Sequence, residues 1–239
     1  MRSDRRFFSD LRPIQLIPHY LDFPEGSLLI VQGNTRVLCN VTAEHGVPHW
    51  IKANNLPIGW VTAEYAMLPR ATHHRTPREA SASSGRTQEI RRLIGRCLRA
   101  AVDLNKIGER TFFIDCDVLQ ADGGTRTAAI TAGFVALAIA LKKLVRNGIL
   151  QEDPLVTQVA AVSVGILDDQ PLLDLCYQED AAAEVDANIV MTSKGDFIEV
   201  QASAEKKPFS YQSMEELLNL AKEGIKQLFE IQNSIIESS

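Results

Sequence analysis

Residues 115–127 read DCDVLQADGGTRT. The β-branched and aromatic side chains of 111–119 predict a strand, and the glycine pair in the quoted stretch predicts a turn. A long apolar run follows and predicts a helix over about 126–145, which the Asn-Gly pair at 147–148 ends. The sequence therefore predicts a strand, a turn and a helix in direct succession at the centre of the chain.

The quoted turn also predicts an anion site. Free backbone N–H groups at the start of a helix, with the helix dipole behind them, attract negative charge. Gly124 lets an anion approach the backbone closely, and Arg126 adds a full positive charge. Arg86 lies at a second predicted helix start, so the two helix ends could converge on one phosphate. Because the stretch is neither a Walker A loop nor a GxGxxG motif, it does not indicate nucleotide binding of those two kinds.

Further strands are predicted on both sides of this unit. Apolar, β-branched runs bounded by turn signals lie at 28–31, 36–41, 59–67, 156–166, 172–177, 185–192 and 197–202. The first two form a hairpin, because Gly and Asn within 32–35 suit a tight turn. A long loop without periodicity covers 69–84, and long loops in compact domains tend to be functional or disordered.

Two amphipathic helices complete the prediction. One begins near 84–87, and its apolar residues recur every three or four positions. The other covers about 213–231 and opens with Ser213 and Glu216 in the spacing of a capping box. No linker, repeat or low-complexity tract interrupts the order of elements. We therefore expect an α/β (α+β) fold in a single domain over residues 1–239.

The composition is that of an ordinary globular protein. The 239 residues are 45% hydrophobic and 23% charged. Four scattered cysteines form no C-x-x-C pair, which indicates buried thiols in a reducing compartment and no zinc site. Residues 1–10 lack the apolar core of a signal peptide, and the apolar run at 128–144 ends in two lysines, which favours a buried helix over a membrane span. We expect a cytoplasmic protein without membrane contact.

The formal net charge of −5 averages regions of opposite sign. Residues 70–99 carry a net charge of +6 and contain arginine but no lysine, whereas 168–186 carry −7. A guanidinium holds a phosphate by two donors at once, so the arginine-only composition favours contacts with phosphate groups. These arginines are Arg70, Arg75, Arg78, Arg86, Arg91, Arg92, Arg96 and Arg99. For Arg91, Arg92 and Arg99, an ordinary exposed helix face fits equally well.

Within the acidic stretch, Asp180 and Asp186 adjoin apolar strand-like segments. Glu184 and Asp186 alternate along one predicted strand and so share a face. Paired carboxylates near a phosphate site suit a hard cation such as Mg2+, which takes oxygen ligands and keeps several waters. A solvated acidic face is the alternative interpretation, and Asp168 and Asp169 fit a turn.

Long and specific motifs are distributed over nearly the whole chain. They are GWVTAEY at 59–65, LPRAT at 68–72, SGRTQEI at 84–90, LIGR at 93–96, the quoted 115–127, DLCYQED at 174–180 and VDAN at 185–188. Together they resemble the signature of the ribonuclease PH family. Its members are phosphate-dependent 3′→5′ exoribonucleases that trim the 3′ ends of tRNA precursors and release nucleoside 5′-diphosphates.

The resemblance implies a phosphate-binding set, a catalytic pair and an assembly. The phosphate-binding residues would be Arg86, Gly124, Thr125 and Arg126, and the catalytic, Mg2+-holding pair would be Asp180 and Asp186. The other seven arginines of the basic stretch would contact RNA or a neighbouring subunit. The resemblance further implies a homohexameric ring built as a trimer of dimers, and a β-α-β-α domain like the second domain of ribosomal protein S5. Exchanging a phosphodiester for a phosphoanhydride should also run in reverse and add nucleotides to RNA 3′ ends.

The chain departs from the family pattern in two places and leaves two alternatives open. Its first residues, MRSDRR at 1–6, differ from the usual opening, and QASAEK at 201–206 stands where relatives usually show QGTAEG. The alternatives are a catalytically silent RNA-binding ring subunit and a metal-dependent hydrolytic nuclease. Silent subunits typically lose an arginine or aspartate that this chain retains, and a hydrolase would need no second phosphate pocket.

Overall fold

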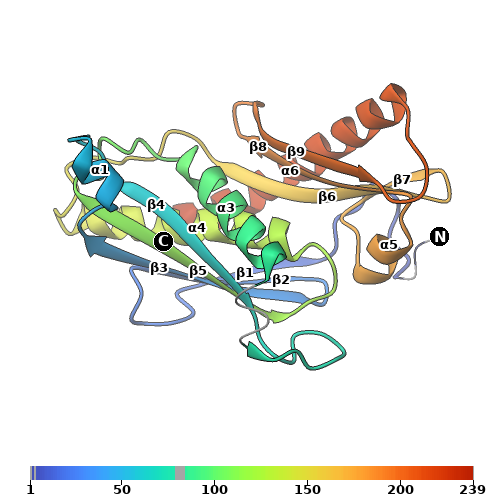
Figure 1. The fold of residues 1–239 in the computed structure, drawn as a ribbon, viewed down its shortest axis with the longest axis horizontal. Coiled ribbons are helices and arrows are strands. Elements are labelled where there is room, and N and C mark those ends of the chain that lie inside the picture. Colours follow the sequence, from blue (N-terminus) through green and yellow to red (C-terminus); the bar gives the residue numbers. More distant parts are fainter. Residues whose placement is uncertain (1, 3, 79–83, 239) are drawn as a thin grey trace.

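The structure is a computed structural model that describes residues 2, 4–78 and 84–238 (Figure 1). Within these residues the chain forms nine strands and five helices. In chain order they are β1 (Ile14–Pro18), β2 (Gly26–Gln32), β3 (Thr35–His45), α1 (His49–Ala53), β4 (Trp60–Met67), α3 (Gly85–Arg99), β5 (Arg110–Gln120), α4 (Thr125–Arg146), β6 (Val159–Leu167), β7 (Gln170–Leu173), α5 (Tyr177–Ala182), β8 (Val185–Thr192), β9 (Phe197–Ala204) and α6 (Tyr211–Ser238).

The first sheet has the strand order β1-β2-β3-β5-β4. Neighbouring strands are antiparallel except β4 and β5, which run parallel. Parallel neighbours need a crossover connection, and α3 supplies it. The predicted hairpin is the β2–β3 pair, whose turn has Gly33 at a φ of +56°.

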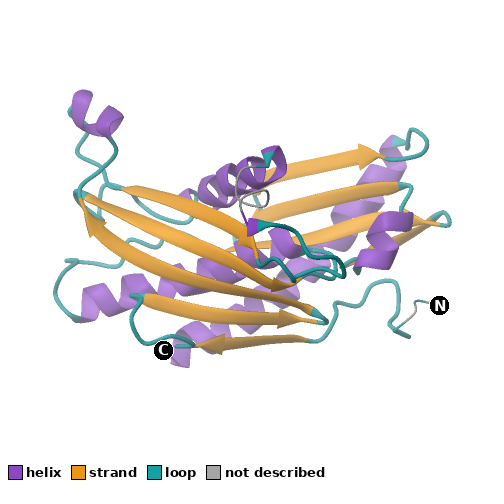
Figure 2. Cartoon of the chain, turned by 60° about the horizontal axis from the view of Figure 1, so that its bottom comes forward, coloured by secondary structure: helices purple, strands orange, loops and turns teal. Residues whose placement is uncertain are grey.

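The second sheet has the order β7-β6-β8-β9, and all of its pairs are antiparallel. In Figure 2 the two sheets lie side by side, with long helices running behind them. Helix α6 covers the second sheet and buries Leu217, Ala221, Ile225 and Leu228 against it. The β5–α4 turn and the segment between β7 and β8 therefore come from different sheets.

Helix α4 forms the centre of the core. It packs against β2, β3 and β6, and it is buried on nearly all sides, as its uniformly apolar sequence predicts. A Cβ atom on Gly26 would lie 2.1 Å from the carbonyl oxygen of Ala136, so glycine is what lets β2 approach the helix this closely. The helix is long and apolar enough to cross a membrane, but 83% of its most apolar window is buried within this fold.

Most predicted elements are confirmed, and two predictions are corrected. The strand predicted at 172–177 is wrong beyond Leu173, because Asp174 takes a left-handed conformation with a φ of +55° that ends the pairing. Helix α5 then begins at Tyr177. Helix α6 begins before the predicted capping box, since Ser210 Oγ accepts a 3.0 Å hydrogen bond from the Ser213 N–H. Elements β1 and α1 were not predicted, and part of the predicted 69–84 loop, 79–83, lies outside the described residues.

Candidate active site

The turn between β5 and α4 presents uncapped backbone donors. Gly123 and Gly124 have φ values of +75° and +65°, and Gly124 caps α4 without a side-chain hydrogen bond. By contrast, Ser84 caps α3 by accepting from the Thr87 N–H at 3.1 Å. Within the described part of the chain, the N–H groups of Gly124, Thr125 and Arg126 find no acceptor. The start of a 22-residue helix therefore keeps free donors in the direction of its dipole, as an anion site requires.

Two arginines stand beside this turn. Arg86 and Arg126 are the second residues of α3 and α4. Both act electrostatically on the same three groups, the hydroxyl of Tyr65 and the carboxyls of Asp180 and Asp186. The structure thus brings together the two helix starts whose convergence the sequence predicts.

The guanidinium of Arg126 is held in place by two neighbours. Its Nη1 donates to Gln201 Oε1 on β9 at 2.6 Å and to Glu89 Oε1 on α3 at 3.3 Å. Thr125 Oγ1 lies 2.8 Å from the hydroxyl of Tyr65, which is 2% exposed on β4. The phosphate-binding candidates are therefore supported by side chains from three other elements.

The candidate carboxylates come from the second sheet and its short helix. Asp180 lies on α5 and Asp186 on β8, and their carboxyl groups lie close enough to shift each other's pKa. Burial and the adjacent charge of Asp180 raise the pKa of Asp186 to about 6, against the opposing charges of Arg126 and Arg86. Burial also raises the pKa of Asp180, although the same two arginines lower it. When both carboxyl groups are ionised they repel each other, and the positive charges of the two arginines offset part of that repulsion.

This donor set fits a hard divalent cation. Among the described residues, no group of three or more His, Cys, Asp or Glu side chains is arranged to hold a metal. Mg2+, however, is commonly bound by one or two carboxylates together with waters and substrate phosphate oxygens. Burial is the largest cause of the raised pKa values of Asp180 and Asp186, and the two carboxyl groups supply the hard oxygen ligands that such a cation prefers. Glu184, which shares their stretch of sequence, pairs instead with Lys207 at 2.9 Å.

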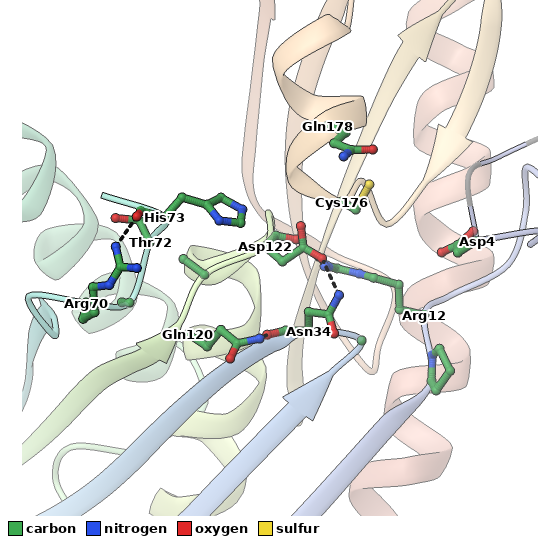
Figure 3. Close-up of a pocket in the computed structure, with 14 residues that line it drawn as sticks. Asp4, Arg12, Asn34, Arg70, Thr72, His73, Gln120, Asp122, Cys176 and Gln178 are labelled. Atoms are coloured by element: carbon green, nitrogen blue, oxygen red, sulfur yellow. Dashed lines mark hydrogen bonds between the residues drawn. The ribbon is translucent and has the colours of Figure 1, made fainter. Parts of the chain in front are cut away.

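A polar cavity of about 720 Å3 adjoins the turn on the side of the β2–β3 hairpin (Figure 3). Asp122 lies at its centre, with Arg70 and His73 on one side and Gln178 at another edge (Figure 3). Arg70 donates to the carbonyl of His73. Of the arginines assigned to RNA, Arg70 is thus the one placed in this cavity.

The other arginines of the basic stretch occupy varied surroundings. Arg75 and Arg78 are exposed in the 69–78 segment, and Arg92 is exposed on α3. Structural partners hold the remaining three, as follows: Arg91 pairs with Glu64 at 2.9 Å, Arg96 pairs with Glu199 at 3.1 Å, and the Arg99 guanidinium lies 4.4 Å from the centre of the Trp60 ring.

Donors at a helix start, two arginines and a carboxyl pair define a site for chemistry on phosphate esters. Comparison with known proteins agrees with this class. Residues 10–143 match domain 1 of the 3′ exoribonuclease family, and residues 157–224 match domain 2. The ribonuclease PH of Dehalococcoides mccartyi strain 195 is 55% identical over 236 residues, 98% of each chain. That of Bacillus subtilis strain 168 is 51% identical over 242 residues, 100% of this chain and 98% of that one.

The chain therefore belongs to the ribonuclease PH branch of the 3′ exoribonuclease family, whose members are phosphorolytic 3′→5′ exoribonucleases. Rice Rrp46 superposes with a TM-score of 0.79 at 20% identity, covering 98% of this chain and 100% of that one. A chain of the Archaeoglobus fulgidus exosome with RNA bound to the active site superposes with a TM-score of 0.77 at 23% identity. The match covers 96% of this chain and 91% of that one. These similarities confirm the predicted α/β class with an arrangement like ribosomal protein S5 domain 2.

Proposed function

We propose that the chain trims the 3′ ends of tRNA precursors with inorganic phosphate as co-substrate, releases nucleoside 5′-diphosphates and also runs in reverse. The observation that carries this proposal is the uncapped start of α4, whose free donors and Arg126 lie beside the Asp180–Asp186 pair. A hydrolytic nuclease would need the carboxylates but not a second anion pocket. The relatives of this chain that are named ribonuclease PH support the phosphate-dependent reaction.

In this proposal, phosphate is the nucleophile. Arg86, Arg126 and the backbone N–H groups of Gly124 and Thr125 hold it against the terminal phosphodiester of the RNA. A phosphate oxygen attacks that phosphorus in line, and the bond to the 3′ oxygen of the shortened RNA breaks. The two arginines offset the negative charge on the transferring group, so positioning and electrostatics supply most of the rate.

The carboxyl pair has two assigned roles. Asp180 and Asp186 would hold Mg2+, which would offset charge on the phosphoryl oxygens when it is bound. One of the two carboxyls delivers the proton that the leaving 3′ oxygen takes up. The raised pKa values of both groups support a function in which they meet a cation or hold a proton.

We assign the arginines at 70, 75, 78, 91, 92, 96 and 99 to contacts with the RNA backbone or a neighbouring subunit. Arg70 in the polar cavity and exposed Arg92 are best placed to reach RNA. We also propose a homohexameric ring of three dimers acting in the cytoplasm. The fold that the chain shares with exosome subunits supports the ring. Four cysteines without disulfides support the cytoplasm, which is a reducing compartment.

The reaction is tested by incubating the protein with a 3′-extended tRNA, with and without phosphate, and separating the released nucleotides. The proposal predicts diphosphates that form only when phosphate is present. Release of monophosphates, or trimming that ignores phosphate, would contradict it in favour of hydrolysis. An intact ring that binds RNA but trims nothing under either condition would favour the silent subunit. Light scattering at several salt concentrations tests the hexamer.

A further inference from the structure

We infer that Arg12 and its partner Asp174 are positioning residues that aim the β5–α4 turn at phosphate and fix it relative to Asp180. This inference rests on the proposed function of that turn. Arg12 touches none of the reacting groups in that proposal and acts through the backbone of the turn. It precedes β1, and 162 residues separate it from Asp174 in the sequence.

Asp174 serves as an anchor at the centre of a buried network. Its side chain is fully buried and accepts four hydrogen bonds. Three come from Arg12, at 2.7 Å from the backbone N–H, 3.0 Å from Nε and 2.6 Å from Nη2. The fourth comes from Gln32 Nε2 at 2.8 Å. The guanidinium of Arg12 is thereby locked in one orientation, with 3% of the residue exposed.

The locked guanidinium reaches the turn itself. Arg12 Nη1 donates to the carbonyl of Asp122 at 2.6 Å, and Nη2 lies 3.5 Å from the carbonyl oxygen of Gly123. Thr35, which is fully buried, donates to the same Gly123 carbonyl at 2.7 Å and accepts from the Asp122 N–H at 3.0 Å. A Cβ atom on Gly124 would lie only 2.9 Å from Arg12 Nη2.

These contacts determine where the free donor points. The Gly123 carbonyl and the Gly124 N–H belong to one planar trans peptide, so they point in opposite directions. By holding the carbonyl, Arg12 and Thr35 turn the Gly124 N–H away from themselves and leave it free for an anion. Loss of either contact lets this peptide rotate, because no other hydrogen bond to that carbonyl is found among the described residues.

The same network reaches the helix that carries Asp180. Asp122 Oδ1 accepts from the backbone N–H of Tyr177, the first residue of α5, at 3.2 Å. A Cβ atom on Gly123 would lie 2.6 Å from the carbonyl oxygen of Leu175 and 2.8 Å from the nitrogen of Tyr177, so the turn packs directly on the start of α5. The phosphate donors and one carboxylate are therefore held by a single unit.

A matched buried ion pair provides the control for stability. Arg2, 6% exposed, pairs with Glu179 at 2.6 Å. Within the described residues, the hydrogen bonds of the Arg2 side chain go to Phe7, Asp10 and 173–179, and none reaches the turn. Both pairs carry the desolvation cost of buried charges, so stability alone gives Arg12 no special role.

The test compares Arg12→Lys and Thr35→Val with Arg2→Lys in the full-length protein. Calorimetric titration with inorganic phosphate, without RNA, gives Kd, and trimming assays give separate KM values for phosphate and RNA. We expect Arg12→Lys and Thr35→Val to raise both the phosphate Kd and its KM about tenfold, with little change in the KM for RNA. Arg2→Lys is expected to lower the melting temperature while leaving the phosphate Kd unchanged.

An unchanged phosphate Kd in Arg12→Lys and Thr35→Val would overturn the inference. So would an increase no larger than that in Arg2→Lys, because the effect would then reflect general loosening. Thr35→Val keeps the side-chain shape and decides the result if Arg12→Lys does not fold. A wild-type protein that binds phosphate but releases no diphosphates would overturn the proposed function alone, and the calorimetric comparison would still decide the role of Arg12.

Discussion

The carboxyl groups of Asp180 and Asp186 lie close enough to shift each other's pKa, although the first lies on helix α5 and the second on strand β8. Two acids held this closely in a half-buried place destabilise the fold when both are ionised. Their position beside Arg86 and Arg126 accounts for why the fold keeps them, because the reaction needs negative groups next to the anion pocket.

Asp186→Asn is expected to remove activity and stabilise the protein. The pKa of Asp186 is raised to about 6, so its charged form opposes folding as the pH rises through that value. A neutral amide has no such cost, and the melting temperature at pH 8 should rise, while kcat falls by roughly 100-fold or more. Thermal unfolding and trimming rates test the pair of effects. A drop in both stability and activity would assign Asp186 a structural role.

Asp174→Asn is expected to destabilise the protein in a pH-dependent way. Burial alone would raise the pKa of Asp174, but the charge and hydrogen bonds of Arg12 outweigh it and lower the pKa. The carboxylate therefore stabilises the fold above its unfolded pKa of about 3.9, and this contribution is lost as the pH falls through the lower folded value.

At pH 7 the free energy of unfolding should be about 3 kcal/mol smaller in Asp174→Asn than in the wild type, because Arg12 is left without its buried partner. Urea unfolding measured at several pH values should show this difference shrinking below about pH 4. A difference that stays constant into acid would mean that Asp174 does not carry the charge in the folded state.

Arg126→Gln separates phosphate binding from RNA binding. Losing charged hydrogen bonds worth about 1.5–3 kcal/mol should raise the KM for phosphate roughly 10- to 100-fold. Arg92→Gln, on the exposed face of α3, provides the matched loss of one positive charge. It should leave the KM for phosphate unchanged and weaken RNA binding in a salt-dependent manner. If both variants raised the KM for phosphate equally, Arg126 would act only through its overall positive charge and not through direct contact with phosphate.

The features of the fold and site that depend on residues close together in the sequence could be predicted from the sequence alone. The turn at Gly123 and Gly124, the helix after it and the arginine next to its start follow from backbone preferences and the helix dipole within a few residues. The same holds for the serine cap of α3, which falls at the predicted helix start.

Features that depend on contacts between distant segments, or that lack a local sequence signal, could not be predicted. Helix α5 is six residues long, too short for a periodic pattern, and a cysteine caps it in place of the usual serine or aspartate. Arg12 and Asp174 meet across the fold, and nothing near either residue signals the contact. Tyr65 reads as an ordinary strand residue until β4 places its hydroxyl against Thr125.

The most direct test of the central claim follows the phosphate itself. Radiolabelled inorganic phosphate is supplied with an unlabelled 3′-extended tRNA, and the released nucleotides are separated and degraded to locate the label. If phosphate bound at the start of α4 is the nucleophile, every released nucleotide is a 5′-diphosphate with the label on its β-phosphorus. Unlabelled monophosphates released at the same rate would show that water attacks instead and would contradict the account.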